Sequence, residues 1–168
     1  MRLLTGALLI CDGVQIQYEA RANSRKFLPS RQCWTGEISA ENFREIRWHP
    51  IDAHPGLPRY RMAAGGDLKG KVFFAGGSVN PYNFNGIAYD GKPSQPEASV
   101  FSYNFKSGEW ECNGNLSTAT MDHRGLPAHK GWFYLIGGMR KVQKVSAKVL
   151  KFKPGNGAPC RSPLAGEF

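Results

Sequence analysis

Residues 131–139 read GWFYLIGGM, an apolar run that stops at a pair of glycines. The same pattern occurs 61 residues earlier, as KVFFAGGS at residues 71–78. Neither run alternates between apolar and polar residues, as expected of a strand that is covered on both faces. The two runs therefore predict strands inside a stack of sheets. Each glycine pair predicts a sharp bend with positive φ, where a neighbouring backbone can approach closely.

Each glycine pair closes a longer segment that begins at an arginine. The first segment starts at Arg61 and the second at Arg124. In both, a short stretch of small or apolar residues is followed by a turn and then by the apolar run, which is the spacing of two strands in a hairpin. The first hairpin has two extra residues, which we assign to a longer turn at 65–70. We expect the two arginines to be equivalent and to hydrogen-bond backbone carbonyls of a neighbouring strand.

Two more strands are predicted after the first glycine pair, in ASVFSYNFKSGEWECNG at residues 98–114. A turn at 106–108 separates them. Tyr103 and Trp110 lie on opposite arms of this hairpin, where large aromatic side chains can pack against adjacent sheets. The repeating unit is therefore four strands, two before the glycine pair and two after it.

This order of residues resembles the Kelch repeat, which forms one blade of a β-propeller. The resemblance rests on Arg61, Gly76, Gly77, Tyr103 and Trp110 in one unit and on Arg124, Gly137 and Gly138 in the next. It implies an all-β fold, a Kelch-type β-propeller fragment built of four-stranded antiparallel blades. In the second unit Phe152 stands at the tyrosine position, and Pro159 stands where a tryptophan is expected.

The resemblance divides the chain into three parts. We expect Kelch-like blades over residues 42–154, with Phe43 or Trp48 as the tryptophan of an earlier blade. Residues 1–41 are predicted to be an N-terminal segment left from that earlier blade. Residues 155–168 are rich in glycine and proline and predict a disordered tail.

This material amounts to about two and a half blades, whereas propellers close with about four to eight. An incomplete ring leaves apolar faces that neighbours should cover. Three explanations stay open at this point: the chain is part of a longer propeller, it assembles with copies of itself, or its reading frame is truncated.

A candidate ligand-binding loop, SVNPYNFNGIAYDGKPSQPEA, spans residues 78–98. It is much longer than its counterpart after the second glycine pair, and loops of this length in compact domains are usually functional or disordered. Its mixture of aromatic and amide side chains suits protein or carbohydrate recognition, with a compact structural loop as the alternative. The candidate ligand-binding residues are Tyr82, Asn83, Phe84, Asn85, Tyr89 and Asp90.

No catalytic residue, metal site or cofactor is predicted. His49, Asp52 and His54 are close in sequence, but a metal needs converging ligands, and the neighbouring prolines favour a connection between blades. Asp122 and His123 precede Arg124 and have the same interpretation. The sequence contains no nucleophile motif and no phosphate-binding loop.

The chain carries a net charge of +9, and much of it lies near the C-terminus. No nucleic-acid-binding motif accompanies this charge, so we expect lysine-bearing strand edges rather than a nucleic-acid partner. The four cysteines lie too far apart in sequence for a close-spaced zinc or redox motif, and disulfides stay open. These features leave the cellular compartment undetermined. No apolar stretch is long enough for a membrane span.

Two function classes follow from the resemblance, and a third explanation is that the chain has no independent function. The first class is a binding module that recognises protein or carbohydrate through its loops. The second is a fragment of a Kelch-fold enzyme, such as a galactose-oxidase-like or sialic-acid-mutarotase-like protein. The oxidase would require two tyrosines and two histidines around copper, with one tyrosine linked to a cysteine. The required partners are remaining propeller blades or further copies of the chain.

Overall fold

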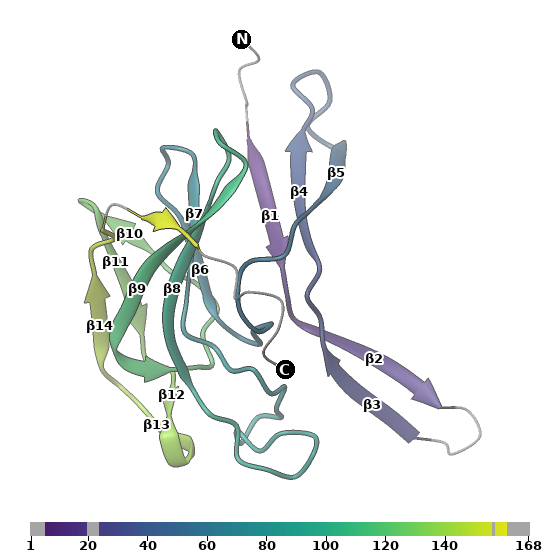
Figure 1. Cartoon of the computed structure of the whole chain (residues 1–168), viewed down its shortest axis with the longest axis vertical. Helices are drawn as coiled ribbons and strands as arrows, with labels where there is room; N and C mark the ends of the chain where they lie inside the picture. The colour runs from purple at the N-terminus through teal and green to yellow at the C-terminus, as the bar shows by residue number, and fades with distance from the viewer. Residues whose placement is uncertain (1–5, 20–23, 156, 161–168) are drawn as a thin grey trace.

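The computed structural model describes residues 6–19, 24–155 and 157–160, and within them the protein is all-β, as predicted (Figure 1). The strands are β1 (Ala7–Cys11), β2 (Val14–Glu19), β3 (Ser24–Pro29), β4 (Cys33–Ile38), β5 (Ile46–Ile51), β6 (Ala63–Gly66), β7 (Lys71–Ala75), β8 (Glu97–Asn104), β9 (Glu109–Thr120), β10 (Ala128–His129), β11 (Trp132–Ile136), β12 (Met139–Arg140), β13 (Lys144–Val145), β14 (Val149–Phe152) and β15 (Ala158–Pro159). The helical structure of the described residues is a short 3-10 turn, Lys141–Gln143. No described helix is long and apolar enough to cross a membrane.

Three antiparallel sheets stand side by side (Figure 1). We call the sheet β1-β4-β5 unit 1, the sheet β6-β7-β8-β9 with β15 at its edge unit 2, and the sheet β10-β11-β14 unit 3. Unit 2 lies between the other two, and its four main strands pair in chain order, as predicted for the repeat. The small hairpins β2-β3 and β12-β13 are inserted within units 1 and 3.

Each unit has a sharp backbone corner directly after one strand, which is β1 in unit 1, β7 in unit 2 and β11 in unit 3. The corner of unit 1 is Asp12 (φ 63°) and Gly13 (φ 107°). The corner of unit 2 is Gly76 (70°) and Gly77 (88°), and that of unit 3 is Gly137 (71°) and Gly138 (92°). The amide of the first corner residue donates in each case to a carbonyl at the next strand: Asp12 to Gln32 at 2.9 Å, Gly76 to Ser99 at 3.2 Å and Gly137 to Lys148 at 3.0 Å. The first corner was not recognised as a repeat in the sequence because aspartate, which tolerates positive φ, replaces the first glycine.

Gly76 and Gly138 leave no space for a side chain. A Cβ atom on Gly76 would lie 2.4 Å from the carbonyl oxygen of Thr120, and one on Gly138 would lie 2.8 Å from that of Met121. These oxygens belong to the last strand of unit 2 and the residue after it. Glycine at the corners therefore meets both requirements, a positive φ and a close backbone approach.

The backbone register corrects the alignment of the two arginines. Bridges join Tyr60 to Ser78 and Met121 to Met139, so residues 60 and 121 are equivalent. The residues after them, Arg61 and Asp122, both have positive φ, at 53° and 66°. Arg61 is thus equivalent to Asp122 and not to Arg124. We predicted that the two arginines would hydrogen-bond backbone carbonyls of a neighbouring strand. Instead, the guanidinium groups of both bind the Asp122 carboxylate, Arg61 at 2.9 Å and Arg124 at 3.1 Å.

Unit 2 is apolar on both faces, as its unalternating strand predicts. Toward unit 1, Phe74, Phe101, Tyr103 and Trp110 pack with side chains that include Leu9 and Cys33. Toward unit 3, a second cluster includes Phe73, Val100, Phe133 and Leu135. The rings of Tyr103 and Trp110 lie 5.0 Å apart, and the Trp110 indole donates to the carbonyl of Asp52 at 2.8 Å. These two aromatics therefore tie unit 2 to unit 1.

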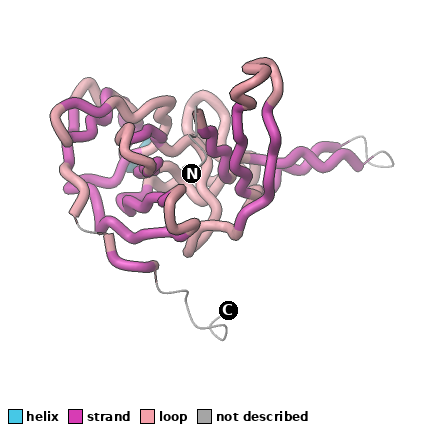
Figure 2. Tube along the Cα trace, turned by 90° about the horizontal axis from the view of Figure 1, so that it is seen from above, coloured by secondary structure: helices cyan, strands magenta, loops and turns pink. Residues whose placement is uncertain are grey.

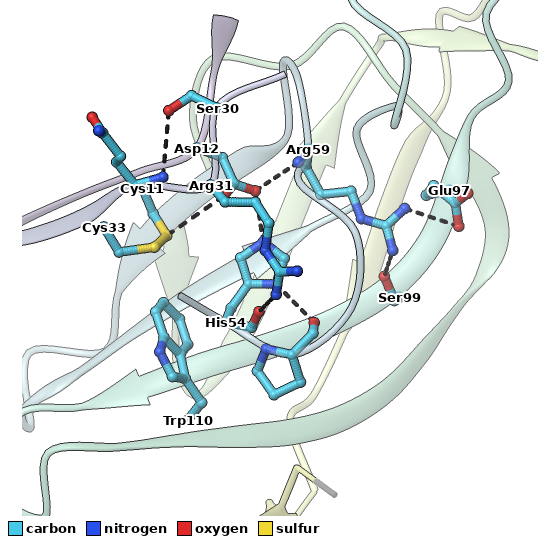
Figure 3. A network of polar contacts seen from close by, with 12 residues as sticks. Cys11, Asp12, Ser30, Arg31, Cys33, His54, Arg59, Glu97, Ser99 and Trp110 are labelled. Atoms are coloured by element: carbon cyan, nitrogen blue, oxygen red, sulfur yellow. Dashed lines mark hydrogen bonds and ion pairs between the residues drawn. A yellow bond between two sulfur atoms is a disulfide. The ribbon is translucent and has the colours of Figure 1, made fainter. Parts of the chain in front are cut away.

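A second link between these units begins at Asp12 (Figure 3). Its carboxylate accepts the amide of Arg59 and contacts His54 Nε2, both at 2.6 Å. The His54 ring is buried and stacks on Phe101 with centroids 4.2 Å apart. The guanidinium of Arg59 continues to Glu97 and Ser99 at 3.0 Å each. The corner residue of unit 1 thereby holds the segment that enters unit 2.

All four cysteines form disulfides, Cys11–Cys33 and Cys112–Cys160. The second one attaches β15 to β9, where Ala158 lies opposite Cys112. The prediction of a disordered tail over 155–168 is therefore wrong for residues 158–160, because an edge strand and a disulfide order them. Residues 161–168 lie outside the described residues, as do residues 1–5 of the predicted N-terminal segment.

The glycine corners give a stability prediction with a matched control. Gly76→Ala is expected to lower the free energy of unfolding by about 3 kcal/mol, from positive-φ strain and the overlap with Thr120. Gly91 has φ 81° but nothing within 4 Å of the added Cβ. Gly91→Ala should cost only about 1 kcal/mol. Urea unfolding of both variants measures the difference, and equal costs would contradict the close approach at the corner.

The disulfides give a second prediction. Oxidised protein, denatured without reductant, should show no reactive thiol because every cysteine is paired. The double substitution Cys112→Ser and Cys160→Ser should lower stability by about 3 kcal/mol, since it releases a 48-residue loop. A thiol assay and denaturant unfolding measure these effects. Two reactive thiols in the wild type would contradict the pairing.

Candidate functional site

Three inserted segments leave the molecule at the same edge, because each follows a backbone corner. They are the hairpin insert (residues 14–19 and 24–29, containing β2 and β3), the long loop (78–96) and the short insert (139–145). We refer to the three together as the loop face. The hairpin insert projects from the body of the molecule in both views (Figures 1 and 2).

The three inserts contact one another. Phe27 of the hairpin insert stacks on Tyr89 of the long loop, with ring centroids 3.7 Å apart and an interplanar angle of 13°. On the other side of the long loop, Gln143 donates to the carbonyl of Ser94 at 3.2 Å. A Cβ on Gly86 would lie 2.5 Å from the sulfur of Met139. Segments from three different units therefore form one continuous surface.

The polar candidates in the long loop mainly stabilise its own turns. The side chains of Asn83 and Asn85 accept hydrogen bonds from amides two residues further on, at 3.2 and 3.0 Å. Asp90 accepts the amide of Lys92 at 3.0 Å and the side-chain amide of Asn80 at 3.1 Å. The bond from the Lys92 amide is the main cause that lowers the pKa of Asp90. Asn85 and Asp90 are exposed and Asn83 is half-buried, and all three side chains are already hydrogen-bonded within the loop.

Tyr82 anchors the loop instead of facing a ligand. It is fully buried, and its ring meets Tyr60 edge-on at 5.2 Å. The guanidinium of Arg61 lies 5.0 Å from the centre of the Tyr82 ring. Burial raises the pKa of Tyr82, and its hydroxyl has no hydrogen-bond partner among the described residues. The prediction of Tyr82 as a surface contact therefore does not fit its position.

The outward aromatic residues are Phe84 and Tyr89, which are 87% and 45% exposed. The hairpin insert adds Ile16 and Tyr18, both exposed, on the same face of the hairpin as Phe27. The sequence did not predict this contribution. The alternation in VQIQY at residues 14–18 is typical of a strand, but nothing in the sequence indicated that Phe27 would meet Tyr89.

The histidine and aspartate groups considered for metal binding have structural contacts. His54 contacts Asp12 and Pro55, at 2.6 and 2.8 Å, whereas His49 is exposed. His123 is buried, and its Nε2 lies 2.9 Å from the Thr120 hydroxyl. Among the described residues, the metal-type cluster comprises Cys11, Asp12 and Cys33, whose two sulfurs are joined to each other.

Comparison with known proteins gives similarity in structure but not in sequence. No protein-family model matches the chain, and no curated protein matches it. Among 66 matching chains of solved structures is the structure of YjhT, with a TM-score of 0.62 and 16% sequence identity. The match covers 89% of this chain and 40% of the YjhT chain, so this chain spans less than half of that protein. At this identity the similarity concerns the fold alone.

The burial of His123 predicts a pH dependence of stability. Burial lowers the pKa of His123 below its ordinary value near 6.5. The unfolded chain therefore binds the proton first, and this contribution to stability is present above about pH 6.5 and decreases as the pH falls below it. His123→Gln should flatten the slope of unfolding free energy between about pH 5 and 7. An unchanged slope would contradict a buried neutral ring.

Proposed function

We propose that the chain is a Kelch-type binding module of three blades that recognises a protein partner through the loop face. Three units with one corner geometry and one strand order support the propeller architecture. The fold similarity to YjhT is compatible with it. The binding function is supported chiefly by the loop face, where inserts from neighbouring units bring Phe27 and Tyr89 together and the long loop exposes Phe84. Binding residues concentrate on loops that a rigid scaffold holds in place.

The internal hydrogen bonds of the polar side chains in the long loop favour a protein ligand over a carbohydrate. The amides and carboxylate of the long loop are bonded within the loop, so fewer remain for sugar hydroxyls. The exposed surface is instead rich in aromatic and aliphatic side chains, the composition of a protein-interface core. A projecting hairpin with Ile16 and Tyr18 on one face adds apolar area that a partner could cover.

The alternative, a fragment of a galactose-oxidase-like or mutarotase-like enzyme, has less support. The oxidase chemistry needs a cysteine linked to a tyrosine, and the four cysteines pair with one another. The two disulfides also support a location in an oxidising compartment.

The proposal predicts that binding depends on exposed aromatics of the loop face. Wild-type chain and the variants Phe84→Ala and Tyr89→Ala are immobilised and exposed to extracts, and bound proteins are quantified by mass spectrometry. A specific partner should bind the wild type and lose about 30-fold in affinity in the variants, as expected for a central aromatic contact. The matched control is Leu68→Ala, because Leu68 is fully exposed and lies in the β6-β7 turn outside the loop face.

A glycan array run with the same four proteins separates the two ligand classes. Glycan binding that is lost in the Phe84 and Tyr89 variants would assign the site to carbohydrate. Partners retained equally by all variants would contradict the loop face as the binding site.

A further inference from the structure

The outer face of unit 1 is apolar, and no other part of the described chain covers it. It carries Leu8, Ile10, Trp34, Ile46 and Trp48, which are 36% to 54% exposed. The strand register places them on one face, because Ile10 lies opposite Trp34, and Trp48 lies opposite Gly36. A Cβ on Gly36 would lie 2.9 Å from the Trp48 ring, so this indole lies across the sheet at the glycine. We call this surface the leading face.

The outer face of unit 3 is also open among the described residues, with apolar β11 side chains and Lys151 of β14 opposite Tyr134. In β11, Phe133 and Leu135 point toward unit 2, so the alternate residues Trp132, Tyr134 and Ile136 point away from it. Ile136 is 66% exposed, and Val149 opposite it on β14 is exposed as well. We call this surface the trailing face. The β11 run is thus as apolar as the β7 run but is covered on one face only.

The leading face matches, position by position, faces that are buried elsewhere in the chain. Ile10 precedes the first corner by two residues, as Phe74 and Leu135 precede theirs, and both of those are buried against the preceding unit. Trp48 lies opposite Gly36 in unit 1, as Trp110 lies opposite Tyr103 in unit 2. Trp48 is therefore the equivalent of Trp110, and it is one of the two residues, Phe43 and Trp48, that we predicted for this position.

The trailing face matches the other half of the same interface. Tyr134 precedes its corner by three residues, as Leu9 and Phe73 precede theirs. Leu9 and Phe73 pack against the unit that follows in the chain. The two open faces are therefore the two halves of a contact that the chain already makes twice internally.

The charges near the two faces are of opposite sign. Residues 128–138 and 146–155, which contain the strands of unit 3 without the short insert, include four lysines and no acidic residue. Residues 33–53, which include β4 and β5 of unit 1, carry four acidic and two basic residues. This asymmetry favours contact between unit 3 of one molecule and unit 1 of another, and disfavours contact between two copies of unit 3.

We propose that a second copy of this chain covers both faces, with the trailing face of each copy on the leading face of the other. Two chains of three units then close a ring of six, within the usual range of about four to eight blades. The proposal rests on the propeller architecture proposed above but not on the ligand.

Sedimentation analysis of the full chain tests the ring. The wild type is expected at twice the 18.6 kDa of one chain, with the dimer dissociating on dilution. Trp48→Glu on the leading face and Ile136→Glu on the trailing face should each give monomer. Leu68→Glu, at a fully exposed apolar residue outside both faces, should remain dimeric.

Mixing the two monomeric variants tests the head-to-tail arrangement. One of the two interfaces in the mixed pair contains both substitutions and the other contains none, so an equimolar mixture should regain a dimer held by one intact interface. A wild-type monomer with a cooperative thermal transition would overturn the proposal, as would larger open assemblies. A dimer that only one of the two substitutions disrupts would also overturn it, because that result indicates a symmetric contact through a single face.

The two proposals fail separately. Phe84→Ala and Tyr89→Ala alter the loop face and should leave the sedimentation of the chain unchanged. A wild-type chain that dimerises but binds no partner through the loop face would contradict the binding proposal alone. A wild-type chain that binds a partner through the loop face but sediments as a monomer would contradict the ring alone.

Discussion

The structure depends on the contact that the corners of units 1 and 2 make with the segment where each unit passes to the next. The amide of Gly77 donates to the carbonyl of Thr120 at 3.0 Å, and that of Gly13 donates to the carbonyl of Arg59 at 3.3 Å. These bonds require a corner with positive φ and, in unit 2, no Cβ atom. They fix where the chain leaves units 1 and 2 for the next unit, and the three inserts, each directly after a corner, emerge at the same edge. The loop face and the two open apolar faces both follow from this constraint.

The parts of the fold that depend on local backbone chemistry could be predicted from the sequence. Gly76–Gly77 and Gly137–Gly138 indicated the corners, and the apolar runs before them indicated strands packed on both sides. The register of the first unit was hidden because Asp12 replaces a glycine. The equivalence of Arg61 with Asp122 could not be predicted, because the residue type suggested that Arg124 is the equivalent of Arg61. Only the pairing register of the backbone shows that Asp122 is equivalent instead.

The parts that depend on contacts between distant segments could not be predicted. Tyr82 and Phe84 are both aromatic residues of one loop, yet one is fully buried and the other is 87% exposed. This difference arises because Tyr60 and Arg61 lie beneath Tyr82, and no local pattern encodes that contact. Likewise the Gly- and Pro-rich segment after residue 155 contains the edge strand β15, which its disulfide to Cys112 holds on the sheet.

The central claim is that one strand order and one corner geometry recur in three units, of which unit 2 has four main strands and units 1 and 3 have three described strands each. Nuclear Overhauser effects between backbone protons test this claim most directly. The account predicts interstrand effects for Tyr60 with Ser78 and for Met121 with Met139, together with a contact between Gly13 and Arg59. Effects that pair residues 132–136 directly with residues 71–75 would instead indicate one continuous sheet and would contradict the repeated unit.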